Sequence, residues 1–162
     1  MYTDVSTYHK MKVQKFGEDR INELKVALIG LSEDAYYWHI MDFLYEKINL
    51  RQPLNPIQNQ MVATEILDAE VNNGGFDQFY YNCQLEYIDD AIEGLKNFGG
   101  ETFVRLAQAS KAIYLKDKES YTGRRSPAFD ILDEEYYALP SYRDKNAAFI
   151  RDNFELTVKE NE

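Results

Sequence analysis

The sequence predicts an all-α fold: a single compact domain of about six to eight helices, packed orthogonally in an irregular bundle. Apolar residues recur at helical spacing through most of the 162 residues, and no segment alternates convincingly with a period of two. The four prolines and eight glycines are too few for a turn-rich β architecture. No internal repeat of about twenty to fifty residues occurs, which argues against a solenoid.

The chain is predicted to consist of an N-terminal arm (residues 1–16), one domain (residues 17–155) and a polar C-terminal tail (residues 156–162). Residues 116–127 form the one long polar loop of the domain, because they carry mixed charge and no apolar periodicity.

The first two helices of the domain have recognisable ends. Glu18 and Asp19 place negative charge at the positive end of the first helix, and Gly30 ends that helix. Ser32 is a favourable N-cap for the second helix. Trp38, the only tryptophan, lies on the apolar face of this helix and is expected to anchor the core.

The third helix has the strongest start signal in the chain. Asn55-Pro56-Ile57-Gln58 supplies an N-cap, a proline at the first helical position and a glutamine at the third. The helix then runs to about Asn72. Glu65 and Asp68 lie one turn apart on it; such a pair can bind a cation, but a solvated helix face is the expected arrangement.

The remaining helices follow the same apolar periodicity. They are predicted over residues 88–98, where Gly99-Gly100 stops the helix, and over residues 103–114, 129–139 and 142–154.

The formal charge of −10 and the pI near 4.7 limit the partners of the protein. An acidic protein repels phosphate groups, so neither direct nucleic-acid binding nor an anionic membrane surface is expected. The charge permits a basic partner, including a DNA-binding protein. The single cysteine, Cys83, excludes an intramolecular disulfide. No apolar stretch reaches the roughly twenty residues of a membrane span, so we expect a cytoplasmic protein.

The sequence contains no recognised catalytic motif. It lacks a P-loop, a dinucleotide fingerprint, an HExxH helix and a CxxC pair. His39, Asp42 and Glu46 share a helix face but need further ligands to hold zinc. Cys83 could act as a nucleophile with His39, although a lone cysteine beside aromatic residues is more often a small buried hydrophobe. We therefore expect no enzyme, no cofactor and no metal.

The run over residues 70–82 has the most unusual residue choices in the chain. Gly74-Gly75 predicts a corner between two helices, where Gly74 takes the left-handed conformation that closes the first helix and Gly75 lets the backbone turn again. Asp77 is then a suitable N-cap for the second helix. Phe76 and Tyr81 have the spacing of a hydrophobic staple around that cap.

Four neutral amide side chains surround this corner. Amides both donate and accept hydrogen bonds, so they can satisfy the backbone groups of the corner or hold a ligand or a peptide backbone. In the second case they would line a pocket together with Trp38 or Tyr81. The four amides belong to Asn72, Asn73, Gln78 and Asn82.

The run resembles the signature of a bacterial family of domains of unknown function that is named after a DNA-mimic protein. The resemblance rests on Glu70, Asn72, Asn73, Gly74, Gly75, Phe76, Gln78, Phe79 and Asn82. The preceding tryptophan-containing helix, the Gly-Gly stop and residues 132–137 extend it to about residues 35–155. The resemblance implies an all-α fold and supplies no catalytic residues. It also implies an acidic protein that imitates duplex DNA and occupies the DNA-binding surface of a transcription factor.

Two acidic clusters are the candidate partner surface for such a mimic. A mimic needs rows of carboxylates with few cations between them, because duplex DNA carries about one charge per 1.7 Å of axis. Here 18 lysines and arginines are interspersed among 28 acidic residues. The first cluster is Glu86, Asp89, Asp90 and Glu93, and the second is Asp130, Asp133, Glu134 and Glu135.

The sequence thus favours a non-catalytic, acidic domain that binds another protein, with DNA mimicry as its most specific form. The alternative is a domain, enzymatic or not, that binds a small molecule or peptide in a pocket at the Asn-Asn-Gly-Gly-Phe corner. A purely structural role within an oligomer is a third possibility, since the oligomeric state is open.

Overall fold

The computed structural model describes residues 17–117 and 126–159, and it confirms the predicted all-α fold for this part of the chain, in which no strand occurs. An N-terminal helix over residues 17–27 precedes α2 (Glu33–Asn49), α3 (Pro56–Cys83), α4 (Ile88–Gly94), the π-helix η1 (Leu95–Gly99), α5 (Glu101–Asp117), α6 (Pro127–Ala138), α7 (Arg143–Asp152) and α8 (Phe154–Val158). The predicted arm (residues 1–16) and most of the polar loop lie outside the described residues. No helix of the described ranges is both long and apolar enough to span a bilayer.

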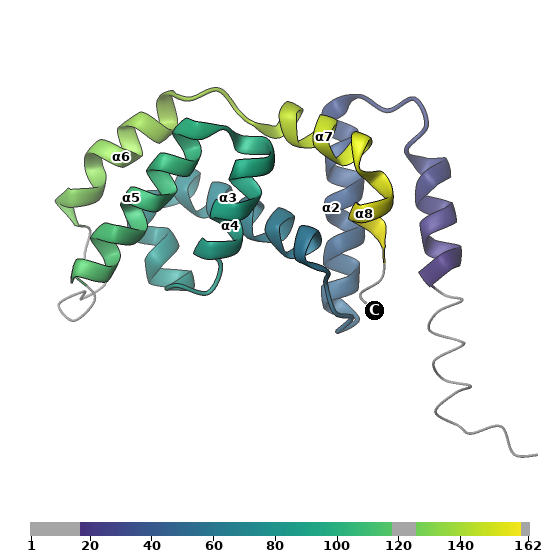
Figure 1. Ribbon diagram of the computed structural model, residues 1–162, viewed down its shortest axis with the longest axis horizontal. Helices are drawn as coiled ribbons and strands as arrows, with labels where there is room; N and C mark the ends of the chain where they lie inside the picture. Colours follow the sequence, from purple (N-terminus) through teal and green to yellow (C-terminus); the bar gives the residue numbers. More distant parts are fainter. Residues whose placement is uncertain (1–16, 118–125, 160–162) are drawn as a thin grey trace, which may run out of the picture.

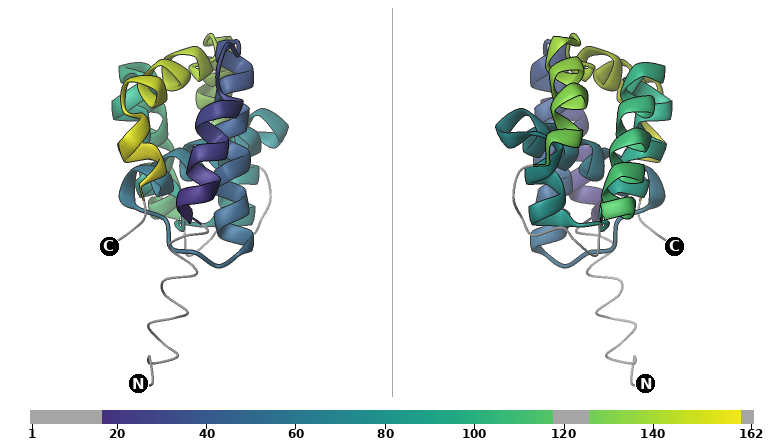
Figure 2. Two further views of the ribbon diagram at one scale, coloured as in Figure 1. Left: turned by 90° about the vertical axis from the view of Figure 1, so that its right-hand side faces the viewer. Right: turned by 90° about the vertical axis from the view of Figure 1, so that its left-hand side faces the viewer.

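Helix α3 runs through the middle of the molecule and connects its two ends (Figure 1). Helices α5 and α6 pack together at one end, while α2, α7 and α8 gather at the other. The N-terminal helix stands between α2 and α8 in the end-on view of Figure 2 (left). Ion pairs fix it there, since Arg20 donates to Glu46 of α2 (2.5 Å) and Lys25 pairs with Glu155 of α8 (3.0 Å).

The two predicted helix caps are confirmed. Ser32 Oγ accepts a hydrogen bond from the Ala35 N–H, as an N-cap of α2 should. At the start of α3, Asn55 Oδ1 accepts from the Gln58 N–H (2.9 Å) and Gln58 Oε1 accepts from the Asn55 N–H (3.0 Å). This reciprocal pair is a capping box, and it satisfies two backbone donors that the helix itself leaves open.

The same capping box holds the C-terminal end of the chain, which corrects the predicted tail. Gln58 Nε2 donates to the Thr157 carbonyl (2.8 Å), and Asn55 Nδ2 donates to the Leu156 carbonyl (3.0 Å). Val158 is buried at 1% exposure. The expected polar tail over residues 156–162 therefore begins inside α8, and the predicted final helix is in fact two helices, α7 and α8.

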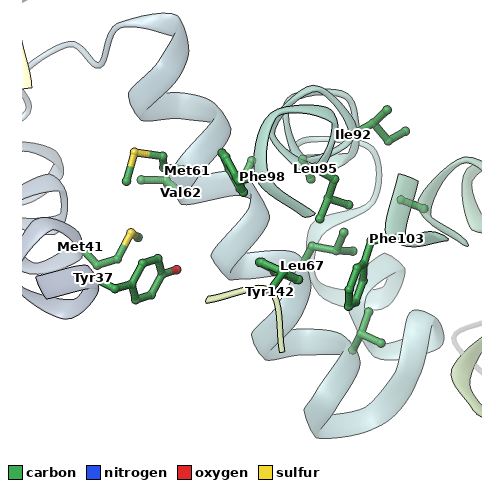
Figure 3. Close-up of a cluster of buried hydrophobic side chains, with 14 of the residues drawn as sticks. Tyr37, Met41, Met61, Val62, Leu67, Ile92, Leu95, Phe98, Phe103 and Tyr142 are labelled. Atoms are coloured by element: carbon green, nitrogen blue, oxygen red, sulfur yellow. The ribbon is translucent and has the colours of Figure 1, made fainter. Parts of the chain in front are cut away.

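The core forms where α2, α4, α5 and α7 close on α3. In Figure 3, Tyr37 and Met41 point from α2 toward α3, where they meet Met61 and Val62. Farther along α3, Leu67 lies among side chains of other helices. These include Ile92 of α4, Leu95 and Phe98 of η1, Phe103 of α5, and Tyr142, the cap residue of α7.

Aromatic rings connect α3, α5 and α6 at the opposite end. Tyr80 of α3 stacks on Tyr114 of α5, with ring centroids 4.3 Å apart, and on Phe129 of α6, at 5.6 Å. Phe76 meets Phe129 and, edge to face, Tyr136. Such pairs add about 0.5–1.5 kcal/mol each beyond the area that they bury. They fix the second half of α3 against α5 and α6.

Candidate functional site

The predicted Gly-Gly corner is a kink inside α3. The backbone leaves helical geometry at Gly74 (φ −161°, ψ 23°) and Gly75 (φ 78°, ψ −178°), and the helix continues to Cys83. The positive φ was predicted at Gly74 but occurs at Gly75, whose combination of angles is essentially restricted to glycine, while Gly74 is in an extended region open to any residue. We call residues 70–82 together with Asp133 the α3 corner.

The second half of α3 is capped by a residue from another helix. Asp133 of α6 accepts a hydrogen bond from the Phe76 N–H at its Oδ1 (2.8 Å). A Cβ at Gly75 would lie only 2.2 Å from Asp133 Oδ2. Gly75 is therefore required both for its backbone angles and for the close approach of this carboxylate. Asp133 is only 2% exposed, so its assignment to an acidic partner surface was wrong.

Two other expectations for the corner are corrected. Asp77 is buried and accepts a hydrogen bond from the Ser126 N–H (2.5 Å), so it holds the start of α6. Tyr81 is 66% exposed and cannot form a staple with the fully buried Phe76. Phe76 packs instead against the aromatic residues of α6.

The four amides of the corner do not gather around one pocket. Gln78 Nε2 and Asn82 Nδ2 both donate to Glu70 Oε2, at 2.8 and 2.9 Å. Asn72 Nδ2 donates to the Asp68 carbonyl (2.8 Å) and to the Asp68 carboxylate (2.9 Å). Asn73 is exposed. Three of the four amides thus form local hydrogen bonds. Phe79, another residue of the predicted signature, lies in the core at 0% exposure.

A pocket of about 350 Å³ does lie beside the corner, but Asn72 is the one corner amide in its lining. Trp38 and Tyr81, which were expected there, do not line it. Its walls come from α3, α5, α6, α7 and the segment before α7. The lining residues are Asp68, Ala69, Asn72, Phe103, Tyr136, Tyr137, Leu139, Pro140, Ser141 and Arg143.

Three of the lining residues belong to a group of buried and half-buried polar side chains that we call the Arg143 cluster. Its members are Tyr37, Glu65, Asp68, Tyr136, Tyr142 and Arg143. Tyr37 donates to Glu65 Oε2, and Tyr136 donates to Asp68 Oδ1 (2.9 Å). Arg143 Nη2 lies 3.5 Å from Glu65 Oε1 and 3.4 Å from Asp68 Oδ2. The guanidinium also stacks on the Trp38 ring at 5.1 Å.

Burial governs the protonation of this cluster. Glu65 is 5% exposed, which corrects the solvated face predicted for Glu65 and Asp68. Burial raises the pKa of the Glu65 carboxyl, although the Tyr37 hydroxyl and the Arg143 charge act in the opposite direction. Burial also raises the pKa of the Tyr37 and Tyr142 hydroxyls, so both tyrosines are neutral donors at pH 7.

The two predicted acidic clusters lie on either side of α5 and are partly neutralised by it. Lys111 of α5 pairs with Asp89, and Arg105 of α5 pairs with Glu135 of α6. On the α4 side, Lys96 of η1 also pairs with Glu93 (2.6 Å). Glu86, Asp90 and Glu134 are exposed, and Asp130 is half-buried.

The candidate catalytic groups are not brought together. Burial, and then the charges of Glu70 and Glu86, raise the pKa of the half-buried Cys83 thiol, which disfavours the nucleophilic thiolate. His39 Nδ1 hydrogen-bonds the Ala35 carbonyl of its own helix (2.8 Å). Residues 17–117 and 126–159 contain no group of three or more His, Cys, Asp or Glu side chains able to hold a metal ion.

Sequence reasoning missed the Arg143 cluster because four helices build it. The sequence placed Glu65 and Asp68 one turn apart on the third helix, but it gave no reason to bury them. Nothing local pointed to Arg143, which is 75 residues from Asp68 in the sequence.

The model of the DMP19-like protein family matches residues 52–153, more than half of the chain. The chain belongs to the DMP19-like family. This family is named after a DNA-mimic protein. The matched region contains the α3 corner and all of the Arg143 cluster except Tyr37, whereas the N-terminal helix, α2 and α8 lie outside it. No curated protein and no solved structure matches the chain.

Proposed function

We propose that the protein is a non-catalytic, acidic, protein-binding member of the DMP19-like family, which acts in the cytoplasm. Its partner is a basic DNA-binding protein, and it competes with DNA for that partner. Family membership and the formal charge of −10 support this proposal. A net negative charge steers a basic partner toward the protein and repels nucleic acid.

The observation that carries the proposal is the arrangement of α4, α5 and α6. These helices follow one another across one end of the molecule, with α5 in the middle (Figure 1). Packed helices lie about 8–10 Å apart, so the axes of α4 and α6 are separated by up to roughly 16–20 Å. This is the same order as the roughly 12 Å width of the DNA major groove. Exposed carboxylates thus lie on helices to either side of α5: Asp89, Asp90 and Glu93 on α4, and Glu134 on α6.

The basic residues of α5 do not remove this acidic character. Arg105 and Lys111 are each held in a surface ion pair with a carboxylate of a neighbouring helix. Exposed pairs of this kind contribute only about 0–1 kcal/mol, so the cations of a partner can compete for the same carboxylates. Glu86, Asp90 and Glu134 are exposed and form no ion pair with a described residue.

The first test is capture of a partner from a bacterial lysate on immobilised protein, followed by elution with duplex DNA. The proposal predicts that a basic, DNA-binding protein is released by DNA and that its affinity falls steeply as salt rises. Captured proteins that are indifferent to DNA, or that are not basic, would refute it.

The second test locates the surface. The triple variant Glu86→Gln, Asp90→Asn and Glu134→Gln should weaken binding of the purified partner by about tenfold, at roughly 0.5 kcal/mol per exposed carboxylate. The matched control changes three exposed acids of α2 and α7, in Asp34→Asn, Asp144→Asn and Asp152→Asn. Both variants alter the net charge equally. Equal effects would assign the binding to overall charge and reject the proposed face.

A further inference from the structure

The pocket beside the α3 corner contains hydrogen-bonding groups that the protein does not use. The guanidinium of Arg143 carries five N–H donors. Only Nη2 has acceptors, at 3.4 and 3.5 Å, which is well beyond the roughly 2.7–2.9 Å of a strong charge-assisted bond. Within the described chain, Nη1 has no acceptor and the buried Nε has no partner. Arg143, the one cation among the described residues that line the pocket, is therefore weakly held.

Two further groups of the lining are open. Ser141 Oγ accepts a hydrogen bond from the Arg143 N–H (3.2 Å), and its own hydroxyl proton has no acceptor among the described residues. Both partners of the Asn72 side chain are acceptors on Asp68, so the amide nitrogen faces Asp68. The amide oxygen of Asn72 is left without a donor from the described residues.

The acidic residue in the lining is already satisfied. The Asp68 carboxylate accepts hydrogen bonds from Asn72, Tyr136 and Arg143. A cationic ligand would have to displace these donors. A ligand with acceptor oxygens meets unused donors on Arg143 and Ser141 instead. Glu65, the second carboxylate near Arg143, is 5% exposed, lies 3.5 Å from Arg143 Nη2 and accepts a hydrogen bond from Tyr37, and it does not line the pocket.

The rest of the lining is apolar or aromatic. Phe103, Tyr137, Leu139 and Pro140 supply walls suited to a ring or a short hydrocarbon chain. At about 350 Å³, the pocket is within the roughly 300–1,000 Å³ range of small-molecule sites.

We propose that this pocket binds a small carboxylate with an apolar or aromatic body, with the carboxylate on Arg143 and Ser141 and the body against Phe103 and Tyr137. The carboxylate can belong to a free small acid or to the C-terminal end of a peptide. The pocket shares no lining residue with the exposed carboxylates of the acidic face, so either proposal can fail alone.

Trp38 provides the measurement. It is the only tryptophan, and its ring stacks on the Arg143 guanidinium, so its fluorescence and indole N–H resonance report any change at Arg143. The probes are benzoate for a free acid and N-benzoylglycine for a peptide-like chain end. Benzamide serves as the neutral analogue and benzylamine as the cation. Benzoate or N-benzoylglycine should bind with a Kd on the order of 1 mM, as expected for so few atoms. If benzoate binds more tightly, the natural ligand is a free small acid; if N-benzoylglycine binds more tightly, it is the C-terminal end of a peptide.

Arg143→Lys keeps the charge and removes the planar fork, and should weaken binding about tenfold or more. Arg151→Lys is the matched control: Arg151 is also on α7, stacks on an α2 ring (Tyr36, 4.2 Å) and pairs with a carboxylate (Glu33, 3.1 Å). It should leave binding unchanged. Ser141→Ala, which removes no ion pair, should weaken binding about threefold and keeps the test valid if Arg143→Lys unfolds. Equal affinity for benzamide, tighter binding of benzylamine, or no response of Trp38 to either acid would overturn the proposal.

Discussion

The α3 corner and the Arg143 cluster are two groups of polar side chains that both include residues of α3, and they differ in how fully their hydrogen bonds are satisfied. In the corner, Glu70 and Asp133 accept bonds of 2.8–2.9 Å from donors that fit them closely. In the cluster, Arg143 reaches its carboxylates only at 3.4–3.5 Å and retains unused donors. The corner fixes the path of the chain, whereas the cluster faces a pocket.

This difference reverses the expectation from the sequence. The run with the most unusual residues serves mainly to build the fold, because Gly75 forms the kink and three of the four amide side chains donate to neighbouring carboxylates or carbonyls. The residues with unused chemistry look ordinary in the sequence. Unusual composition therefore indicates a demanding backbone as readily as it indicates a ligand site. Stability and ligand measurements can separate these two roles, because the corner should control folding and the cluster should control binding.

The largest effect on stability is expected at Gly75. Gly75→Ala places a side chain in a glycine-only backbone region and 2.2 Å from Asp133, and should cost about 3 kcal/mol or more. Gly30→Ala is the matched control, because Gly30 has a similar φ of 75° but no neighbour within 4 Å of an added Cβ. It should cost about 1 kcal/mol. Urea denaturation measures both. Equal losses would show that the approach of Asp133 contributes nothing.

A smaller loss is expected when the cap of the second half of α3 is removed. Asp133→Ala leaves the buried Phe76 N–H without its acceptor and should cost about 2–3 kcal/mol. Asp133→Asn keeps an acceptor oxygen and should cost about 1 kcal/mol. Glu134→Ala, at the exposed neighbouring position of α6, should change the free energy of unfolding by less than about 0.5 kcal/mol. If Asp133→Asn and Asp133→Ala cost the same, the carboxylate is not acting as a cap.

These residues also mark how far the sequence could predict the structure. Helix starts at Ser32 and Asn55 were predictable, because a cap is formed by side chains within three residues of each other. The kink at Gly75 was predictable from the glycine pair. The cap that follows the kink was not predictable, because Asp133 is 57 residues from Phe76. In the sequence, Asp133 resembles the exposed acidic residues around it in α6. Asp77 was a plausible local cap, so the sequence gave no reason to look for a capping residue on another helix.

The candidate site was predicted less well, for the same reason. The amides of the corner were singled out as possible binding groups, but only tertiary structure shows Gln78 and Asn82 meeting on Glu70. The periodicity of α3 gave no sign that Tyr37 and Arg143 would cover Glu65. Polar clusters contributed by several helices leave no pattern in any one of them.

The third effect is a pH dependence that is specific to the cluster. Burial raises the pKa of Glu65 above its ordinary value near 4.5, so the folded state binds this proton more tightly than the unfolded state. The stability that Glu65 contributes is fully present below about pH 4.5 and is lost as pH rises through its folded pKa. The free energy of unfolding of the wild type, minus that of Glu65→Gln, should therefore fall across this interval, by no more than about 1.4 kcal/mol per pH unit.

Denaturation in urea at a series of pH values gives this difference directly. Glu86→Gln, at an exposed position, changes the net charge identically and serves as the control. If the difference in the free energy of unfolding between the wild type and Glu65→Gln rises with pH, the ion pair with Arg143 outweighs the effect of burial. The polar groups of the cluster would then be as well satisfied as those of the corner.

The smallest effect is expected at Asn82, and it separates the two regions most directly. Asn82 is exposed and donates one hydrogen bond to Glu70, which Gln78 also binds, so Asn82→Ala should cost only about 0.5 kcal/mol in urea denaturation. The same variant should leave the response of Trp38 to benzoate unchanged, because Asn82 does not line the pocket. A loss of benzoate binding in Asn82→Ala would show that the corner and the cluster act as one site, because Glu70, the partner of Asn82, is only two residues from Asn72 of the pocket lining in the same helix.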